Sequence, residues 1–164
     1  MSLDTILITG GCGYIGSHTC IPLLENKYNI LIIDSLINSY ETTFVNIKKI
    51  FKKKGININE RIEFIKGDLR NKEWLDQIFR EYKKSLKPIK FVFHFAGVKS
   101  IYSSINNPLE YWDNNVSNTL ALLEVMQSNK CFNLIFSSSA SVYKPISSRM
   151  LKENDPLEPT TPYG

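Results

Sequence analysis

The sequence lacks any long apolar run. No apolar stretch of this 164-residue chain approaches the ~20 residues that a membrane-spanning helix needs. The first residues, Met1-Ser2-Leu3-Asp4, do not form a basic region followed by a long apolar segment, so we predict no secretory signal. We therefore expect a cytoplasmic protein without a membrane partner.

Cysteine and histidine are scarce. The three cysteines, Cys12, Cys20 and Cys131, are odd in number and have no spacing typical of disulfides or metal sites. We expect reduced, partly buried thiols of a cytoplasmic protein. The two histidines, His18 and His94, have no second metal-type ligand beside them, so we predict no metal site. His94 lies in a strand pattern and is expected to be a core or interface histidine with satisfied hydrogen bonds.

The charge is only modestly unbalanced. The net charge is +4, and much of the excess lies in Lys48-Lys49 and Lys52-Lys53-Lys54. Phe51 is the single aromatic residue among these lysines, so we interpret them as a solvated helix face and predict no nucleic-acid partner. A content of 43% hydrophobic and 22% charged residues is ordinary for one globular domain with a real core.

Strand and helix patterns alternate along the whole chain. Short β-branched runs predict five buried strands, and segments with apolar residues three and four apart predict four helices. The alternation predicts an α/β fold with a doubly wound parallel sheet, Rossmann-like, whose ligands bind at the carboxyl ends of the strands. The predicted strands cover 5–9, 29–34, 62–66, 91–95 and 133–138, and the predicted helices cover 14–26, 39–54, 72–84 and 108–128.

The positions of the prolines support the predictions for the last helix and for the tail. Pro108 suits the first turn of a helix. The tail after Tyr143 has four prolines and is predicted to be loop. The inward stripe of the helix is expected to include Val116, Leu120, Leu123 and Met126.

A glycine-rich loop joins the first strand to the first helix. Gly10, Gly11, Gly13 and Gly16 satisfy the G-x-G-x-x-G spacing, which lets the backbone turn sharply and approach a pyrophosphate at a helix N-terminus. Asp34 ends the second strand, near the ~20-residue separation expected of a ribose-binding carboxylate. A carboxylate there repels a 2′-phosphate, so the pattern favours NAD over NADP. A flavin, another nucleotide or a purely structural turn are the alternatives.

Seven segments extend this pattern, at 9–18, 67–70, 94–99, 108–111, 113–116, 137–143 and 162–164. Together they resemble the N-terminal half of the extended short-chain dehydrogenase family, and within it the UDP-glucose 4-epimerases. The resemblance implies that 1–164 is an NAD-binding domain that stops before the family's final strands and small substrate domain. It also implies that these residues alone bind NAD weakly and are inactive.

The resemblance also implies which residues hold the cofactor. The backbone at Tyr14 and Ile15 would contact the pyrophosphate, Asp68 would accept from the adenine amino group, and Lys99 would donate to a ribose. Two of the residues have simpler alternatives, because Asp68 would also suit a cap of the third helix and Asn114 an ordinary polar helix position. The implied NAD-binding residues are Gly10, Gly13, Tyr14, Ile15, Gly16, Asp34, Asn38, Ser39, Asp68, Leu69, Phe95, Ala96, Gly97, Lys99, Asn114 and Ser137.

Two residues carry the chemistry that the resemblance implies. Ser139 would hydrogen-bond the sugar oxygen at carbon 4, and Tyr163 would remove its proton. A free phenol, with a pKa of about 10, is a poor base at neutral pH, and the family lowers that value with a lysine four residues on, a position beyond Gly164. The implied function is interconversion of UDP-glucose and UDP-galactose through a 4-keto intermediate, with NAD that stays bound and a UDP-sugar as substrate.

Three other functions stay open. Nucleotide-sugar dehydratases of this family typically place Asp-Glu directly after the hydroxyl residue, whereas here Ala140-Ser141 follows Ser139, which favours an epimerase. An epimerase for another UDP-sugar and a non-catalytic NAD-sensing protein are the remaining alternatives. The resemblance also implies a homodimer that pairs through the helices predicted over 72–84 and 108–128.

Overall fold

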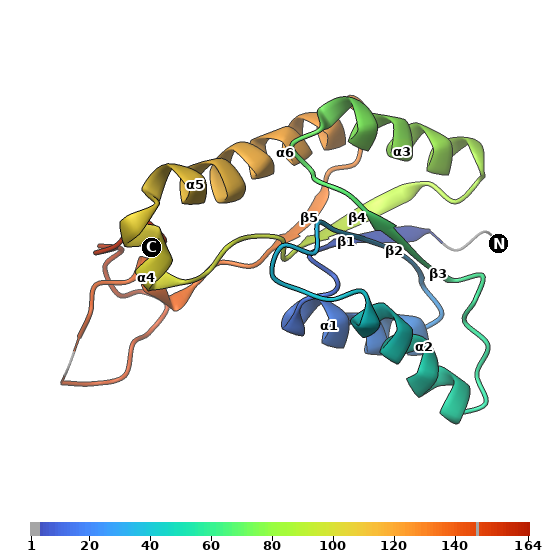
Figure 1. Ribbon diagram of the computed structural model, residues 1–164, viewed down its shortest axis with the longest axis horizontal. Helices are drawn as coiled ribbons and strands as arrows, with labels where there is room; N and C mark the ends of the chain where they lie inside the picture. Colours follow the sequence, from blue (N-terminus) through green and yellow to red (C-terminus); the bar gives the residue numbers. More distant parts are fainter. Residues whose placement is uncertain (1–3, 147) are drawn as a thin grey trace.

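The computed structural model describes residues 4–146 and 148–164. Its centre is a five-stranded sheet in the order β3-β2-β1-β4-β5, with every neighbouring pair parallel (Figure 1). This order confirms the predicted doubly wound sheet, because the chain reverses its direction of winding between β3 and β4. The strands are β1 (Thr5–Thr9), β2 (Asn29–Asp34), β3 (Ile62–Lys66), β4 (Ile89–His94) and β5 (Asn133–Phe136).

Helices cover both faces of the sheet, as Figure 1 shows. One face carries α1 (Tyr14–Glu25) and α2 (Thr42–Lys53), and the other carries α3 (Lys72–Lys84) and α6 (Asn118–Ser128). Three shorter elements lie between β4 and α6, and one follows β5. These are α4 (Ile101–Asn106), α5 (Pro108–Trp112), the π-helical turn η1 (Asp113–Ser117) and the 3-10 turn η2 (Ala140–Val142).

Alternation along the strands divides the core into two layers. Leu7 of β1 faces α3 and α6, whereas Ile6 and Ile8 face α1 and α2. All residues of β1 and β2 are buried, which explains their nearly continuous apolar sequence. At the edge of the sheet, Ile135 and Phe136 of β5 are both about half exposed.

The long helix predicted over 108–128 is interrupted by η1, and the predicted inward stripe is wrong at two of its four residues, while Val116 is half-buried. Leu120 and Leu123 are 54% and 38% exposed, whereas Met126 is buried as expected. The wider turn of a π-helix accommodates an extra residue, so it shifts the phase of every following position. The residues that α6 buries are Asn118, Ala121, Leu122, Val125 and Met126.

Two segments outside the predicted strands and helices contain structure. Ser100 caps α4, its hydroxyl accepting from the Ser103 N–H, in a stretch for which no element is predicted from the sequence. In the tail, an antiparallel bridge joins Tyr143 to Leu157 after η2. Within the described part of the chain, no helix has the length and apolar character needed to span a membrane.

Candidate active site

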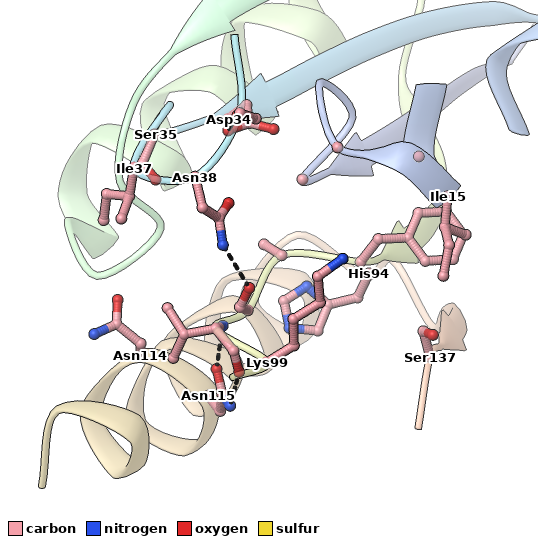
Figure 2. A pocket seen from close by; sticks show the side chains of 18 of the residues that line it. Ile15, Asp34, Ser35, Ile37, Asn38, His94, Lys99, Asn114, Asn115 and Ser137 are labelled. Atoms are coloured by element: carbon pink, nitrogen blue, oxygen red, sulfur yellow. Dashed lines mark hydrogen bonds between the residues drawn. The ribbon is translucent and has the colours of Figure 1, made fainter. Parts of the chain in front are cut away.

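A pocket of about 660 Å³ lies at the carboxyl ends of the strands. It brings together every cofactor-binding and catalytic residue predicted from the sequence. Figure 2 shows part of its lining, with Asp34 and Asn38 on one side and Asn114, Asn115 and Ser137 on others. Residues 9–16, 94–99 and 137–139, far apart in the sequence, meet here because parallel strands direct all their carboxyl ends to one edge.

The glycine loop forms the floor of this pocket beside α1. Gly10 has φ +66°, and a Cβ on it would lie 2.7 Å from the backbone N of Ala96. A Cβ on Gly16 would lie 2.5 Å from the Gly10 carbonyl oxygen, so α1 packs directly against the loop. The helix begins after Gly13 with neither a side-chain cap nor an acidic residue in its first turn. Its first N–H groups therefore face the pocket as an anion-binding end.

Asp34 is buried at the end of β2 and cross-links two loops. Its Oδ2 accepts from the Cys12 N–H at 2.9 Å. Its Oδ1 accepts from the Leu36 N–H at 2.9 Å and from the Ser39 hydroxyl at 2.8 Å. A carboxylate offers about four acceptor positions, so one is left for a ligand hydroxyl. Asn38 turns away from Asp34 and donates to the Gly97 carbonyl at 3.4 Å (Figure 2).

Arg70 bridges the end of β3 to η1. Its guanidinium donates to both oxygens of Asp68, at 2.6 to 3.1 Å, and also to Asp113. These bonds hold the pKa of the Asp68 carboxyl below its usual value. The alternative that Asp68 caps α3 is wrong, because Asn71 is the cap and accepts from the Trp74 N–H. Asp68 therefore lines the pocket as a fixed carboxylate.

Asn115 is a pocket residue that sequence reasoning missed. Its Oδ1 accepts from the Val98 N–H and its Nδ2 donates to the Val98 carbonyl, both at 2.8 Å (Figure 2). These two hydrogen bonds fix the position of the loop that carries Lys99. The neighbouring Asn114 donates to the Glu110 carbonyl and also lines the pocket. The π-helical turn carries both residues, and no sequence pattern we used detects such a turn.

His94 is confirmed as a core histidine. It is 2% exposed, and its two ring nitrogens lie 2.6 and 2.9 Å from the hydroxyls of Thr9 and Thr119. Burial lowers the pKa of His94 to about 4, so the ring is neutral at pH 7.

The two predicted catalytic residues approach the pocket from the β5 side. The Ser139 hydroxyl oxygen accepts from the Ser141 N–H at 3.2 Å and so begins η2. Tyr163 packs edge-on against Tyr111 with ring centroids 6.3 Å apart. The tail that leads to Tyr163 is held by the Tyr143–Leu157 bridge and by the Lys144–Glu158 ion pair. Ser139 and Tyr163 therefore both reach the pocket from supported segments.

The cysteines and the possible metal ligands add no further reactive group to the site. Cys12, Cys20 and Cys131 are free and buried, and burial raises the pKa of Cys12 and of Cys20 to about 12. Residues 4–146 and 148–164 contain no group of three or more His, Cys, Asp or Glu side chains that could hold a metal ion.

Residues 7–164 match the sequence pattern of one protein family, described as GDP-mannose 4,6 dehydratase. The chain belongs to that family. Several similar relatives are named UDP-glucose 4-epimerases. UDP-glucose 4-epimerase 1 of Oryza sativa subsp. japonica is 42% identical over 162 residues, covering 99% of this chain and 43% of the relative. UDP-glucose 4-epimerase of Yersinia pestis is also 42% identical, covering 97% of this chain and 44% of the relative.

Solved structures agree with this family and with the fold. A UDP-glucose-4-epimerase from Stenotrophomonas maltophila, with bound NAD and formylated UDP-arabinopyranose, superposes with a TM-score of 0.84 at 35% identity. The Bifidobacterium longum enzyme in complex with NAD+ and UDP gives the same values. Both comparisons cover 98% of this chain and 44% of the other. The chain thus spans less than half the length of these relatives.

Proposed function

We propose that the protein is an NAD-dependent 4-epimerase that interconverts UDP-glucose and UDP-galactose. The observation that carries this proposal is the single pocket in which the glycine loop and Asp34 meet Ser139 and Tyr163. The relatives support it, because those named above are UDP-glucose 4-epimerases. The proposal treats 1–164 as the NAD-binding domain, and we expect these residues alone to be inactive.

The residues present fit NAD. A Cβ on Gly10 or Gly16 would occupy the cradle through which a pyrophosphate approaches the first turn of α1. Asp34 and Asp68 lie at the ends of β2 and β3 and suit the adenosine half, which leaves the ends of β4 and β5 for the nicotinamide half. Asp34 retains one acceptor position for a ribose hydroxyl and disfavours a 2′-phosphate. Bound there, NAD would accept and return a hydride at carbon 4 of the sugar.

Ser139 and Tyr163 would handle the proton that accompanies this hydride. The Ser139 hydroxyl can hold the oxygen at carbon 4, because its hydrogen is not used in the bond with the Ser141 N–H. The Tyr163 side chain would remove the proton from that oxygen. It would return the proton after the 4-keto sugar has rotated to present its other face to the cofactor. General-base assistance of this kind contributes about 10²–10⁴-fold to a rate.

The dehydratase alternative is less well supported by the pocket. Elimination of water needs an additional acid and base near the reacting sugar. Ala140 and Ser141 follow Ser139 and carry no carboxylate. Among the described residues that line the pocket, the carboxylates are Asp34 and Asp68, both engaged and both at the adenosine end.

The proposal is tested by incubating the protein, in its full natural length, with UDP-galactose and identifying the product. We expect UDP-glucose, with turnover reduced at least 10²-fold in Ser139→Ala and in Tyr163→Phe. Tyr102→Phe, an exposed tyrosine of α4 outside the pocket, is the matched control and should leave turnover unchanged.

Other products would overturn this assignment. A 4-keto-6-deoxy sugar would identify a dehydratase, and turnover of UDP-N-acetyl sugars or UDP-glucuronate alone would identify another epimerase. Binding of NAD with no turnover of any nucleotide sugar would favour the NAD-sensing alternative.

The proposal includes a cytoplasmic homodimer. Three free, buried cysteines fit a reducing compartment. Leu120 and Leu123 on α6 and Trp112 on α5 are exposed apolar side chains on the helices through which pairing is proposed. Light scattering would test this, and a monomer at micromolar concentration would contradict it.

A further inference from the structure

One buried polar atom of the pocket has no partner. Asn118, the first residue of α6, is 8% exposed, and its Oδ1 is the one fully buried side-chain nitrogen or oxygen in the described residues without a hydrogen bond. An unsatisfied buried acceptor costs about 1–3 kcal/mol. Groups of this kind in native proteins are rare, and each calls for an explanation.

Asn118 belongs to the reaction end of the pocket. It lines the pocket one helical turn after Asn114. The next residue, Thr119, contacts the His94 ring on β4 through its hydroxyl, and that ring packs on Phe136 of β5. Asn118 is thereby anchored on the β4–β5 side of the sheet, the side from which Ser139 enters.

The other nitrogen-bearing side chains on this side are committed or lack an acceptor. His94 has a hydroxyl on each ring nitrogen, and Asn115 uses both ends of its amide on Val98. Lys99 is a donor and offers no acceptor. Ser137 and Ser138 also line the pocket, but each offers a single hydroxyl oxygen, whereas Asn118 offers an amide with a separate donor and acceptor.

We propose that the side-chain amide of Asn118 hydrogen-bonds the carboxamide of the nicotinamide ring, a step that rests on the proposed binding of NAD. A carboxamide presents one carbonyl acceptor and one NH₂ donor, which is the complement of an asparagine amide. Rotation of the Asn118 amide by 180° exchanges its oxygen and nitrogen, so either end can turn to the ligand. Because Oδ1 is fully buried, this bond requires that rotation, which turns the oxygen from its enclosed position toward the pocket. The oxygen then gains a partner in the complex, which makes Asn118 a determinant of affinity for the nicotinamide end.

The test compares Asn118→Leu with the unaltered protein, in its full natural length, using three ligands in calorimetric titrations. ADP-ribose lacks the nicotinamide ring, and 3-acetylpyridine adenine dinucleotide carries a methyl ketone that has no N–H donor. We expect Asn118→Leu to weaken NAD binding about tenfold and to leave ADP-ribose binding unchanged. We also expect the preference of the protein for NAD over the acetylpyridine analogue to disappear in the variant.

Stability provides the second readout. Leucine matches asparagine in shape and removes the unpaired oxygen, so Asn118→Leu should unfold at the same denaturant concentration as the unaltered protein or at a higher one. Asn118→Ala should give the same ligand pattern if leucine is too bulky. Asn106→Leu, on α4 outside the pocket, is the control and should change none of the three affinities.

The outcomes separate this proposal from the proposed function. Equal weakening of NAD and ADP-ribose, equal weakening of NAD and the acetylpyridine analogue, or no weakening of NAD would overturn the role of Asn118 alone. Failure of the unaltered protein to bind either NAD or ADP-ribose would overturn the proposed function itself, and the Asn118 proposal with it.

Discussion

Replacing Gly10 by alanine tests the architecture of the pocket floor. Gly10 has φ +66°, a conformation that costs an L-residue about 1–2 kcal/mol. Its Cβ would also lie 2.7–2.8 Å from backbone atoms of Ala96 and Phe95, so the glycine loop and the segment directly after β4 must separate at a further cost of about 1–3 kcal/mol. We expect Gly10→Ala to lower the free energy of unfolding by about 2–5 kcal/mol.

Gly55 provides the matched control. Its φ of +71° is nearly the same, but no atom lies within 4 Å of the position of its Cβ. Gly55→Ala should therefore cost only the backbone strain of about 1–2 kcal/mol. Urea unfolding measures both variants, and titration with NAD should show lost binding only for Gly10→Ala. Equal destabilisation by the two substitutions, or normal NAD binding by Gly10→Ala, would refute the close approach of the loop to the segment after β4.

The remaining predictions concern the supports of the pocket. Asn115→Ala removes two hydrogen bonds to the Val98 backbone and should cost about 1–3 kcal/mol in urea unfolding; a loss below 0.5 kcal/mol would contradict the clamp. Arg70→Met should weaken NAD binding severalfold but change unfolding by about 1 kcal/mol or less, since its ion pairs are partly exposed; unchanged NAD affinity would contradict its positioning role. His94 has a folded pKa of about 4 against an ordinary 6.5, so the unfolded state takes up its proton first and stability should fall by at most about 3 kcal/mol as the pH drops from 6.5 to 4. His94→Gln should flatten that part of the pH profile of unfolding, and a profile unchanged from that of the unaltered protein would contradict the assignment.

The parts of the fold that follow from local pattern were predictable. Buried strands are marked by runs such as Ile30-Leu31-Ile32-Ile33, and the glycine spacing from Gly10 to Gly16 carries its own geometric requirement. Asp34 was predictable for the same reason, because it stands at a set distance from the loop. Its three internal hydrogen bonds were not, since they depend on how Cys12 and Ser39 meet it in space.

The parts that depend on tertiary context were missed. Helical periodicity assumes 3.6 residues per turn, so the π-helical turn at 113–117 displaced the predicted buried face onto Leu120 and Leu123. Asn115 and Asn118 were not among the predicted site residues. Asn115 matters through its hydrogen bonds to the Val98 backbone, and Asn118 through an oxygen without a partner, and both depend on tertiary structure. The 3-10 turn at Ser139 likewise arises from a local cap that no apolar pattern marks.

In the proposed reaction, the pocket would epimerise a UDP-sugar at carbon 4 by moving a hydride to bound NAD and back. The most direct measurement converts UDP-galactose in D₂O with the protein in its full natural length and examines carbon 4 of the product by NMR. A hydride that never leaves the pocket cannot exchange with solvent, so we expect UDP-glucose with the original hydrogen at carbon 4. Deuterium at carbon 4, or no conversion of UDP-galactose, would contradict it.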